Sequence, residues 1–258
     1  MRAFARVLAL GATLAACAGV PAHALAEQTV ALHASFSPDR LGASTTIGFS
    51  FHIVNSEGGL PSPLTSVSLG LPAGINYLST TLGLAICQPQ ALLARGLAGC
   101  SPNARLGHGS AYVEVPFGQG SGREIPNIQA LMGPPHEGNI VVLFYANGLE
   151  PVYAQIVFEG ELIAGTQTLG GRLEAMVPLV PSVPGGPPVS IVSLNATIGP
   201  AGLTYYERVH GHIVSFHPQG VSVPAHCPRG GFAFSALFTF EDGTSTSARS
   251  SVPCPRGR

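Results

Sequence analysis

Apolar and polar residues alternate with a period of two along several stretches of the chain. The two clearest stretches are 29–36, where the apolar positions are Val30, Leu32, Ala34 and Phe36, and 45–54, where they are Ile47, Phe49, Phe51 and Ile53. Successive side chains of a β-strand point to opposite faces of a sheet. The alternation therefore predicts two strands, each with one buried face.

Further runs of strand length recur along the chain, separated by Gly, Pro, Ser or Asn. We expect strands at 64–71, 110–115, 125–131, 140–145, 152–158, 171–177, 189–198 and 209–216. The C-terminal part predicts a hairpin, because 232–240 alternates apolar residues, Asp242-Gly243 is a two-residue turn signal, and 244–252 returns.

One segment favours a helix. Pro89 suits the first helical turn, 91–95 contains helix-favouring residues, and Gly96 can end the helix. So short a helix is not stable alone in water, and we expect a bond between Cys87 and Cys100 to hold it. The connection 178–188 is rich in Pro and Gly and is therefore expected to be extended.

About a dozen strands and one short helix predict an all-β fold, an antiparallel β-sandwich of immunoglobulin-like or related architecture. The region 27–258 is long enough for one large domain or two lobes. If there are two lobes, the Gly-rich segment 118–124 is the expected boundary.

The first 26 residues have the pattern of a secretory signal peptide. Arg2 and Arg6 provide the positive start, and an uncharged apolar run covers 7–20. Small residues at 24 and 26 fit cleavage before Glu27, and those at 22 and 24 fit cleavage before Leu25. The apolar run is shorter than the ~20 residues that a membrane-spanning helix needs. We therefore expect a secreted, extracellular protein.

A second interpretation overlaps with the first. Leu14-Ala15-Ala16-Cys17 resembles a bacterial lipobox, in which Cys17 would be acylated and would anchor the protein to a membrane. We favour the released form, because good cleavage sites lie just downstream. No later segment predicts a transmembrane helix, since the apolar run 139–145 has only the length of a strand.

If Cys17 leaves with the signal peptide or carries lipid, the cysteines that remain are Cys87, Cys100, Cys227 and Cys254. An even number of cysteines in an exported chain predicts disulfide bonds. Of the three pairings, we favour Cys87–Cys100 and Cys227–Cys254, because each closes a local loop. A zinc site is not indicated, because the chain has no Cys-x-x-Cys pair.

Charge excludes some classes of partner. Loss of Arg2 and Arg6 with the signal peptide reduces the 12 cationic residues to ten against 13 acidic ones, a net charge near −3. This balance gives no electrostatic reason to bind nucleic acid or an anionic membrane. Charged residues make up only 10% of the chain, and a surface so poor in charge favours association with a cell wall or another surface.

No motif predicts a metal or a cofactor. His210 and His212 would share one face of the strand 209–216, with His217 and His226 further on, but no acidic ligand lies between His212 and Glu241. We expect these histidines to be solvated. The chain also lacks the Gly-x-Ser-x-Gly, His-Glu-x-x-His and phosphate-loop motifs, so no catalytic residue is assigned.

One pair of acidic residues invites comparison with glycosidases. Glu159 and Glu161 could share a strand face, but the carboxylates of a glycosidase usually come from separate elements. We expect both to be exposed at a turn around Gly160. The absence of Trp weakens a carbohydrate-binding function.

The chain resembles a group of uncharacterised secreted proteins of actinobacteria. The resemblance rests on Leu71-Pro-Ala-Gly-Ile75, Cys87 with Cys100-Ser-Pro102 and Leu106-Gly107, Cys227-Pro-Arg-Gly-Gly-Phe232, Phe240-Glu-Asp-Gly243 and Val252-Pro-Cys254-Pro255. It implies export and a β-rich fold, and it carries no established activity. The N-terminal strands also resemble bacterial immunoglobulin-like surface modules, at the level of the fold.

The leading expectation is a non-catalytic, secreted or envelope-associated β-sandwich protein with a structural or binding role, whose partner the sequence does not identify. One alternative is an extracellular hydrolase with a site assembled from distant residues. Another is a surface lipoprotein that presents a ligand-binding domain, and Cys17 is its only support.

Overall fold

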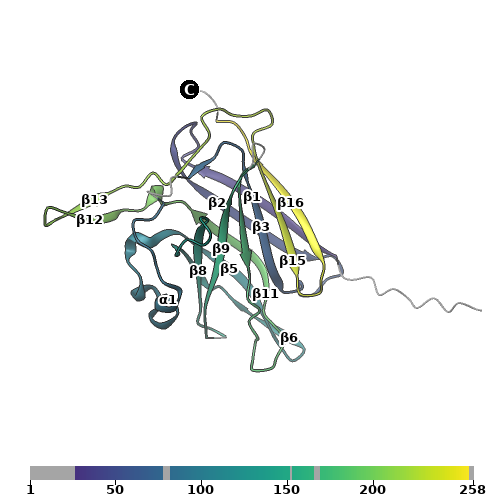
Figure 1. The fold of residues 1–258 in the computed structure, drawn as a ribbon. Helices are drawn as coiled ribbons and strands as arrows, with labels where there is room; N and C mark the ends of the chain where they lie inside the picture. The colour runs from purple at the N-terminus through teal and green to yellow at the C-terminus, as the bar shows by residue number, and fades with distance from the viewer. Residues whose placement is uncertain (1–26, 78–81, 152, 166–168, 256–258) are drawn as a thin grey trace, which may run out of the picture.

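Antiparallel strands make up most of the protein. The structure, a computed structural model, describes residues 27–77, 82–151, 153–165 and 169–255. It contains a 14-stranded sheet, a two-stranded sheet and one short α-helix (Figure 1). The all-β class, the antiparallel pairing and the disulfide-stapled helix are therefore confirmed.

The strands of the main sheet are β1 (Gln28–Ser37), β2 (Ser44–Asn55), β3 (Leu64–Pro72), β4 (Asn76–Tyr77), β5 (Arg105–Phe117), β6 (Gly120–Glu124), β7 (Asn127–Met132), β8 (Ile140–Gly148), β9 (Ala154–Ala164), β10 (Leu169–Met176), β11 (Ser190–Ile198), β14 (Val221–Ser222), β15 (Phe232–Phe240) and β16 (Ser245–Val252). Their order is β16-β15-β3-β10-β9-β8-β7-β5-β11-β2-β14-β4, with β1 paired to β2 and β6 paired to β5.

The sheet curls until β1 lies along β16 (Figure 1). The Ala34 N–H of β1 donates a hydrogen bond to the Ser250 hydroxyl of β16 at 3.1 Å. Phe36 of β1 packs edge-on against Phe232 of β15, with ring centroids 5.4 Å apart. The two layers of the sandwich are therefore parts of one continuous, curled sheet.

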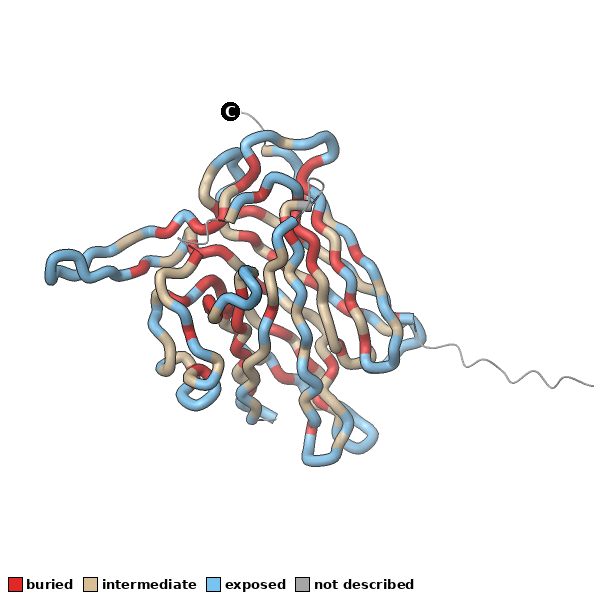
Figure 2. Tube along the Cα trace, in the orientation of Figure 1, coloured by how far each residue is buried: buried red, intermediate tan, exposed pale blue. Residues whose placement is uncertain are grey.

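The main hydrophobic core fills the space between these layers. Along β15 the inward side chains Phe232, Phe234, Phe238 and Phe240 are at most 2% exposed. Figure 2 shows buried and exposed residues alternating along the strands, as the sequence pattern predicts. Full burial of each such ring contributes about 1.5–3 kcal/mol to stability.

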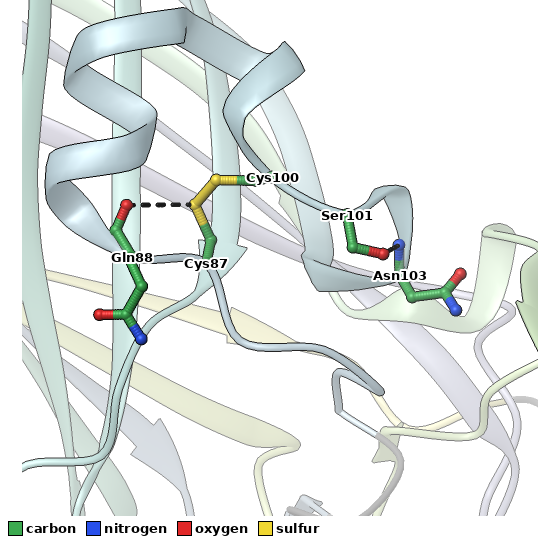
Figure 3. Close-up of a disulfide and its surroundings, with 5 residues drawn as sticks. All are labelled: Cys87, Gln88, Cys100, Ser101 and Asn103. Atoms are coloured by element: carbon green, nitrogen blue, oxygen red, sulfur yellow. Dashed lines mark hydrogen bonds between the residues drawn. A yellow bond between two sulfur atoms is a disulfide. The ribbon is translucent and has the colours of Figure 1, made fainter.

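A disulfide closes the loop that contains the helical segment (Figure 3). The helix α1 (Pro89–Arg95) is followed by the short 3₁₀ helices η1 (Gly96–Gly99) and η2 (Pro102–Ala104), and η3 (Pro200–Gly202) lies later in the chain. The Cys87–Cys100 bond joins the two ends of α1 and η1. Leu92 of α1 is fully buried against the sheet, so the bond holds the helix where its apolar side is covered.

The second disulfide, Cys227–Cys254, ties the open end of the C-terminal hairpin, as the local-loop argument predicts. At the closed end Gly243 takes φ = 82°. The Asp242 carboxylate there accepts a hydrogen bond from the Thr244 N–H at 2.9 Å. Turn and disulfide thus fix both ends of β15 and β16.

The prediction of one strand at 209–216 is wrong. The chain instead forms a separate hairpin of β12 (Tyr205–Val209) and β13 (His212–Phe216), which projects from the body (Figure 1). His210 and Gly211 form its turn with φ of 48° and 85°. A tight hairpin turn of this kind requires positive φ at both central residues, and the His-Gly pair was not recognised as one.

The segment 118–124 forms the turn and the second strand of a hairpin. Phe117 pairs with Gly120 across the turn, and Gly118 adopts φ = 52°. Both strands, β5 and β6, belong to the main sheet. The segment therefore lies inside the sheet and is no extended linker.

The segment predicted to be a signal peptide, and Cys17 as the alternative predicted lipidation site, lie outside the described residues. Within the described ranges, no helix has the length and apolar character needed to cross a membrane.

Candidate functional site

An apolar cavity of about 180 Å³ lies on the inner side of the curled sheet. Strands β2, β3 and β5 to β11 line it, together with Pro126, the segment 177–180 and Val189. Its lining residues are Phe49, Phe51, Leu64, Val67, Leu69, Ala111, Val113, Glu124, Pro126, Ile128, Phe144, Ala146, Gly148, Ala154, Ile156, Phe158, Leu173, Ala175, Val177, Pro178, Leu179, Val180, Val189, Ile191, Leu194, Ala196 and Ile198. All of these except Glu124 are apolar.

Strand periodicity explains why these side chains meet. Most lining residues of a strand are two positions apart, as in Ala154, Ile156 and Phe158 of β9. In β11 the spacing between lining residues is three positions, not two, from Ile191 to Leu194, where the register against β5 shifts. The bulge inserts one extra residue, so the side chains on both sides of it face the cavity.

Aromatic stacking and a glycine shape one wall of the cavity. Phe144 of β8 and Phe158 of β9 are directly opposite, and their rings stack with centroids 5.1 Å apart. A Cβ atom on Gly160 would lie 2.8 Å from Cε2 of Phe144. Glycine at this position thus leaves room for the Phe144 ring.

The cavity reaches the surface at the end of the sheet that carries the β5–β6 turn. Leu179 lines the cavity and is nevertheless 43% exposed. The Pro- and Gly-rich connection folds back on itself here, because the Val189 N–H donates to the Val180 carbonyl at 2.8 Å. Exposed Ile125 and Leu149 directly adjoin the lining residues Pro126 and Gly148, so the opening has apolar neighbours.

Glu124 is the one ionisable residue among the described residues that line the cavity. It ends β6 opposite Val113 of β5, and directly opposite residues project to the same face of a sheet. The residue is only 8% exposed, and its Oε1 accepts no hydrogen bond from any described residue. The one ionisable residue of an otherwise apolar lining therefore has a buried carboxylate oxygen without a described partner.

The other charges of this hairpin pair with one another on its outer face. Glu114 accepts hydrogen bonds from the hydroxyls of Ser121 at 2.6 Å and Tyr112 at 2.9 Å, and its Oε1 lies 3.6 Å from Nε of Arg123. The hydrogen bond from Ser121 lowers the pKa of Glu114, and the hydrogen bond from Tyr112 and the positive charge of Arg123 lower it further. The charge of Arg123 is thus directed away from Glu124.

Glu159 and Glu161 do not lie at a turn as expected. Both belong to the strand β9, with Gly160 buried between them. The hydrogen bond from Asn139, with a second from His136 at 3.2 Å, lowers the pKa of Glu161. Both carboxylates project from the outer face of the sheet, whereas Gly160 lies on the face that lines the cavity.

The histidines considered as metal ligands are not assembled into a site. His210 lies in the turn of the projecting hairpin and His212 in its returning strand, so they do not share one strand face. Over the residues that the structure describes, no group of three or more His, Cys, Asp or Glu side chains is placed to hold a metal ion.

Sequence reasoning missed the cavity and Glu124. The signal available was the small size of several inward positions, such as Ala111, Ala146, Ala175 and Ala196. In a well-packed interior, small side chains are matched by large ones from the facing element. That match depends on which strands face each other, which the sequence pattern does not give.

No family model, no curated protein and no solved structure matches this chain. The resemblance to secreted actinobacterial proteins therefore stays a prediction.

Proposed function

We propose that this protein is an exported, non-catalytic binding protein that holds a small apolar ligand inside its curled sheet. The observation that carries this proposal is the cavity of about 180 Å³, lined by apolar residues apart from Glu124. Ligand sites are concave, mostly apolar and equipped with few polar groups. This cavity has that character.

Physical chemistry favours an apolar occupant over water. A buried water needs two to four polar partners, and an engineered apolar cavity of about 150 Å³ stays dry and binds benzene. Here the described lining offers a single polar side chain, Glu124. The cavity is therefore suited to the hydrocarbon part of a small molecule.

The chemistry of the lining favours binding over hydrolysis. Among the described lining residues there is no Ser, Cys or His that could act as a nucleophile or as its base. A lone carboxylate lacks the second group that acid–base hydrolysis requires. The alternative of an extracellular hydrolase receives no support from this cavity.

Export is part of the proposal. The two disulfides, Cys87–Cys100 and Cys227–Cys254, are typical of proteins that fold in an oxidising compartment. The signal-peptide pattern of 1–26 agrees with this, and acylation of Cys17 is the route by which the same binding domain would be anchored at a membrane.

Titration with 1-octanol, followed by methyl NMR spectra of the protein, tests binding. Burial of about six methylene groups at about 0.8 kcal/mol each gives about 5 kcal/mol, a dissociation constant of about 0.2 mM. We expect saturable shifts of methyl groups that line the cavity, such as those of Ile156 and Leu173.

Two substitutions of the same kind separate cavity binding from surface adsorption. Ala154→Leu places a larger side chain in the cavity, whereas Ala233→Leu places it on the exposed face of β15. We expect Ala154→Leu to weaken octanol binding by at least about tenfold and Ala233→Leu to leave it unchanged. Absence of saturable shifts in the wild type, or equal effects of both variants, would contradict the proposal.

A further inference from the structure

The position of Glu124 bears on which apolar molecules the cavity accepts. Its side chain projects from β6 into the cavity beside Val113, with 8% of the residue exposed. Burial of a charged group without a partner is unfavourable, and proteins normally pair such groups. In this hairpin the neighbouring carboxylate, Glu114, is so paired on the outer face.

The described residues supply no compensating group for Glu124. Among the described residues no Arg or His forms an ion pair with it, and Arg123 lies beside Glu114 instead. The other described lining residues carry no hydrogen-bond-donating side chain. A donor on a molecule that occupies the cavity would supply what the described residues do not.

We infer that the ligand is an apolar molecule that ends in a hydrogen-bond donor, an ammonium or a hydroxyl group, and that Glu124 selects it against apolar carboxylates. This inference rests on the proposed binding function and names its ligand class. The donor end lies against the carboxylate of Glu124, and the hydrocarbon part fills the cavity among Ile156, Phe158 and their neighbours.

Charge sets the order of preference. An ammonium group makes a charge-assisted hydrogen bond with a carboxylate, a hydroxyl makes a weaker one, and an ionised carboxylate is repelled. Octylammonium and 1-octanol carry the same eight-carbon chain, whereas the eighth carbon of octanoate is its carboxyl carbon. Octanoate therefore buries one methylene fewer, which is worth about fourfold in affinity, and a preference beyond that isolates the contribution of Glu124.

The test is an NMR titration of the full-length mature protein with octylammonium, 1-octanol and octanoate at about pH 7, where the amine is protonated and the acid ionised. We expect octylammonium to bind at least about tenfold more tightly than octanoate, with 1-octanol between them. A preference for octylammonium over octanoate of about fourfold or less in the wild type would overturn the inference, because the shorter hydrocarbon part of octanoate accounts for it.

Glu124→Gln removes the charge and keeps the shape of the side chain. We expect it to reduce the preference for octylammonium over octanoate by at least about tenfold. Glu57→Gln is the matched control, because it changes the net charge equally at an exposed turn, and it should keep the wild-type preference. An unchanged preference in Glu124→Gln would also overturn the inference.

The outcomes separate the two proposals. If 1-octanol binds and Ala154→Leu weakens it, but the end group has no effect, the binding function stands and the role of Glu124 fails. If none of the three ligands gives saturable shifts, the binding function itself fails. Should Glu124→Gln not fold, the order of the three affinities in the wild type still decides.

Discussion

Val113 and Glu124 lie directly opposite each other in β5 and β6, so an aliphatic side chain and a carboxylate project into the same cavity. In the next pair along the strands, Glu114 and Arg123 project to the outer face, where Oε1 of Glu114 lies 3.6 Å from Nε of Arg123. On the outer face of this hairpin Glu114 and Arg123 pair with each other, whereas the carboxylate of Glu124 on the inner face has no described partner. This asymmetry distinguishes the interior from an ordinary packed core.

Removal of an aromatic ring from the cavity wall should change which ligands fit. Phe158 stacks on Phe144, with ring centroids 5.1 Å apart, and lines the cavity. Phe158→Ala should favour 1-decanol over 1-octanol more strongly than the wild type does, because the enlarged cavity buries about two further methylene groups. Affinities from NMR titration check this. A decrease in affinity for both alcohols would contradict it.

Substitution in the core of β15 should destabilise the fold far more than substitution of the adjacent residue. Phe238 is fully buried and packs edge-on against Phe51, with ring centroids 5.0 Å apart. Phe238→Ala should cost about 3–5 kcal/mol of unfolding free energy. The neighbouring Leu237 is 44% exposed, and Leu237→Ala should cost less than about 1 kcal/mol. Urea denaturation measures both, and similar losses would contradict the assigned burial.

Alkaline pH should destabilise the protein through Tyr205. Burial raises the pKa of Tyr205 to about 12, whereas an unfolded tyrosine titrates near 10. The folded state therefore retains a proton that the unfolded state has released between these values, and the stability from this group is present below about pH 10 and lost as the pH rises towards 12.

Tyr205→Phe should reduce this alkaline loss of stability, measured by urea denaturation at a series of pH values. At neutral pH it should cost about 1 kcal/mol, because the Tyr205 hydroxyl donates to the Arg105 carbonyl at 2.6 Å. The control is Tyr206→Phe, since Tyr206 is 57% exposed. An identical pH dependence in Tyr205→Phe and the wild type would show that the assignment is wrong.

Removal of the disulfide at the open end of the C-terminal hairpin should weaken the closure of the sheet. Cys227 and Cys254 are 27 residues apart in the chain, and a bond over such a loop contributes about 3–4 kcal/mol. The variant with both cysteines replaced by Ala should lose about that much unfolding free energy. A loss below about 1 kcal/mol would show that the strand contacts alone hold this end.

The intact mass of the protein from its native host should decide between release and lipid anchoring. We expect a chain that begins at Glu27 or Leu25, and that takes four thiol labels only after reduction. A mass beginning at Cys17 with added acyl chains would instead establish the anchored form. Thiols that react without reduction would contradict the two disulfides.

Much of the fold could be predicted from the sequence, because one buried face imposes a period of two on a strand. The predicted strand 45–54 corresponds to β2 (Ser44–Asn55), and all four predicted inward residues are buried. The Asp242-Gly243 turn and the loops closed by the cysteines are likewise local features. The pattern missed β6 and the hairpin of β12 and β13, which lack that periodic signal because they are largely exposed.

The candidate site, in contrast, could not be predicted from the sequence. No motif directed attention to Glu124, because a single glutamate after a glycine-rich turn reads as a surface residue. Only its register against Val113 reveals the direction of its side chain. A shift of one residue in that pairing would have placed it outside and Arg123 inside.

By itself the sequence determined the all-β class, the position of the helix and the local disulfide pairs, because turns, strand periods and short loops depend on residues near one another in the chain. The tertiary structure alone decided that β1 meets β16, that nine strands surround an apolar cavity and that Glu124 points into it. These features depend on pairings between segments far apart in the chain, and the geometry of the curled sheet sets the space that the small inward side chains leave unfilled.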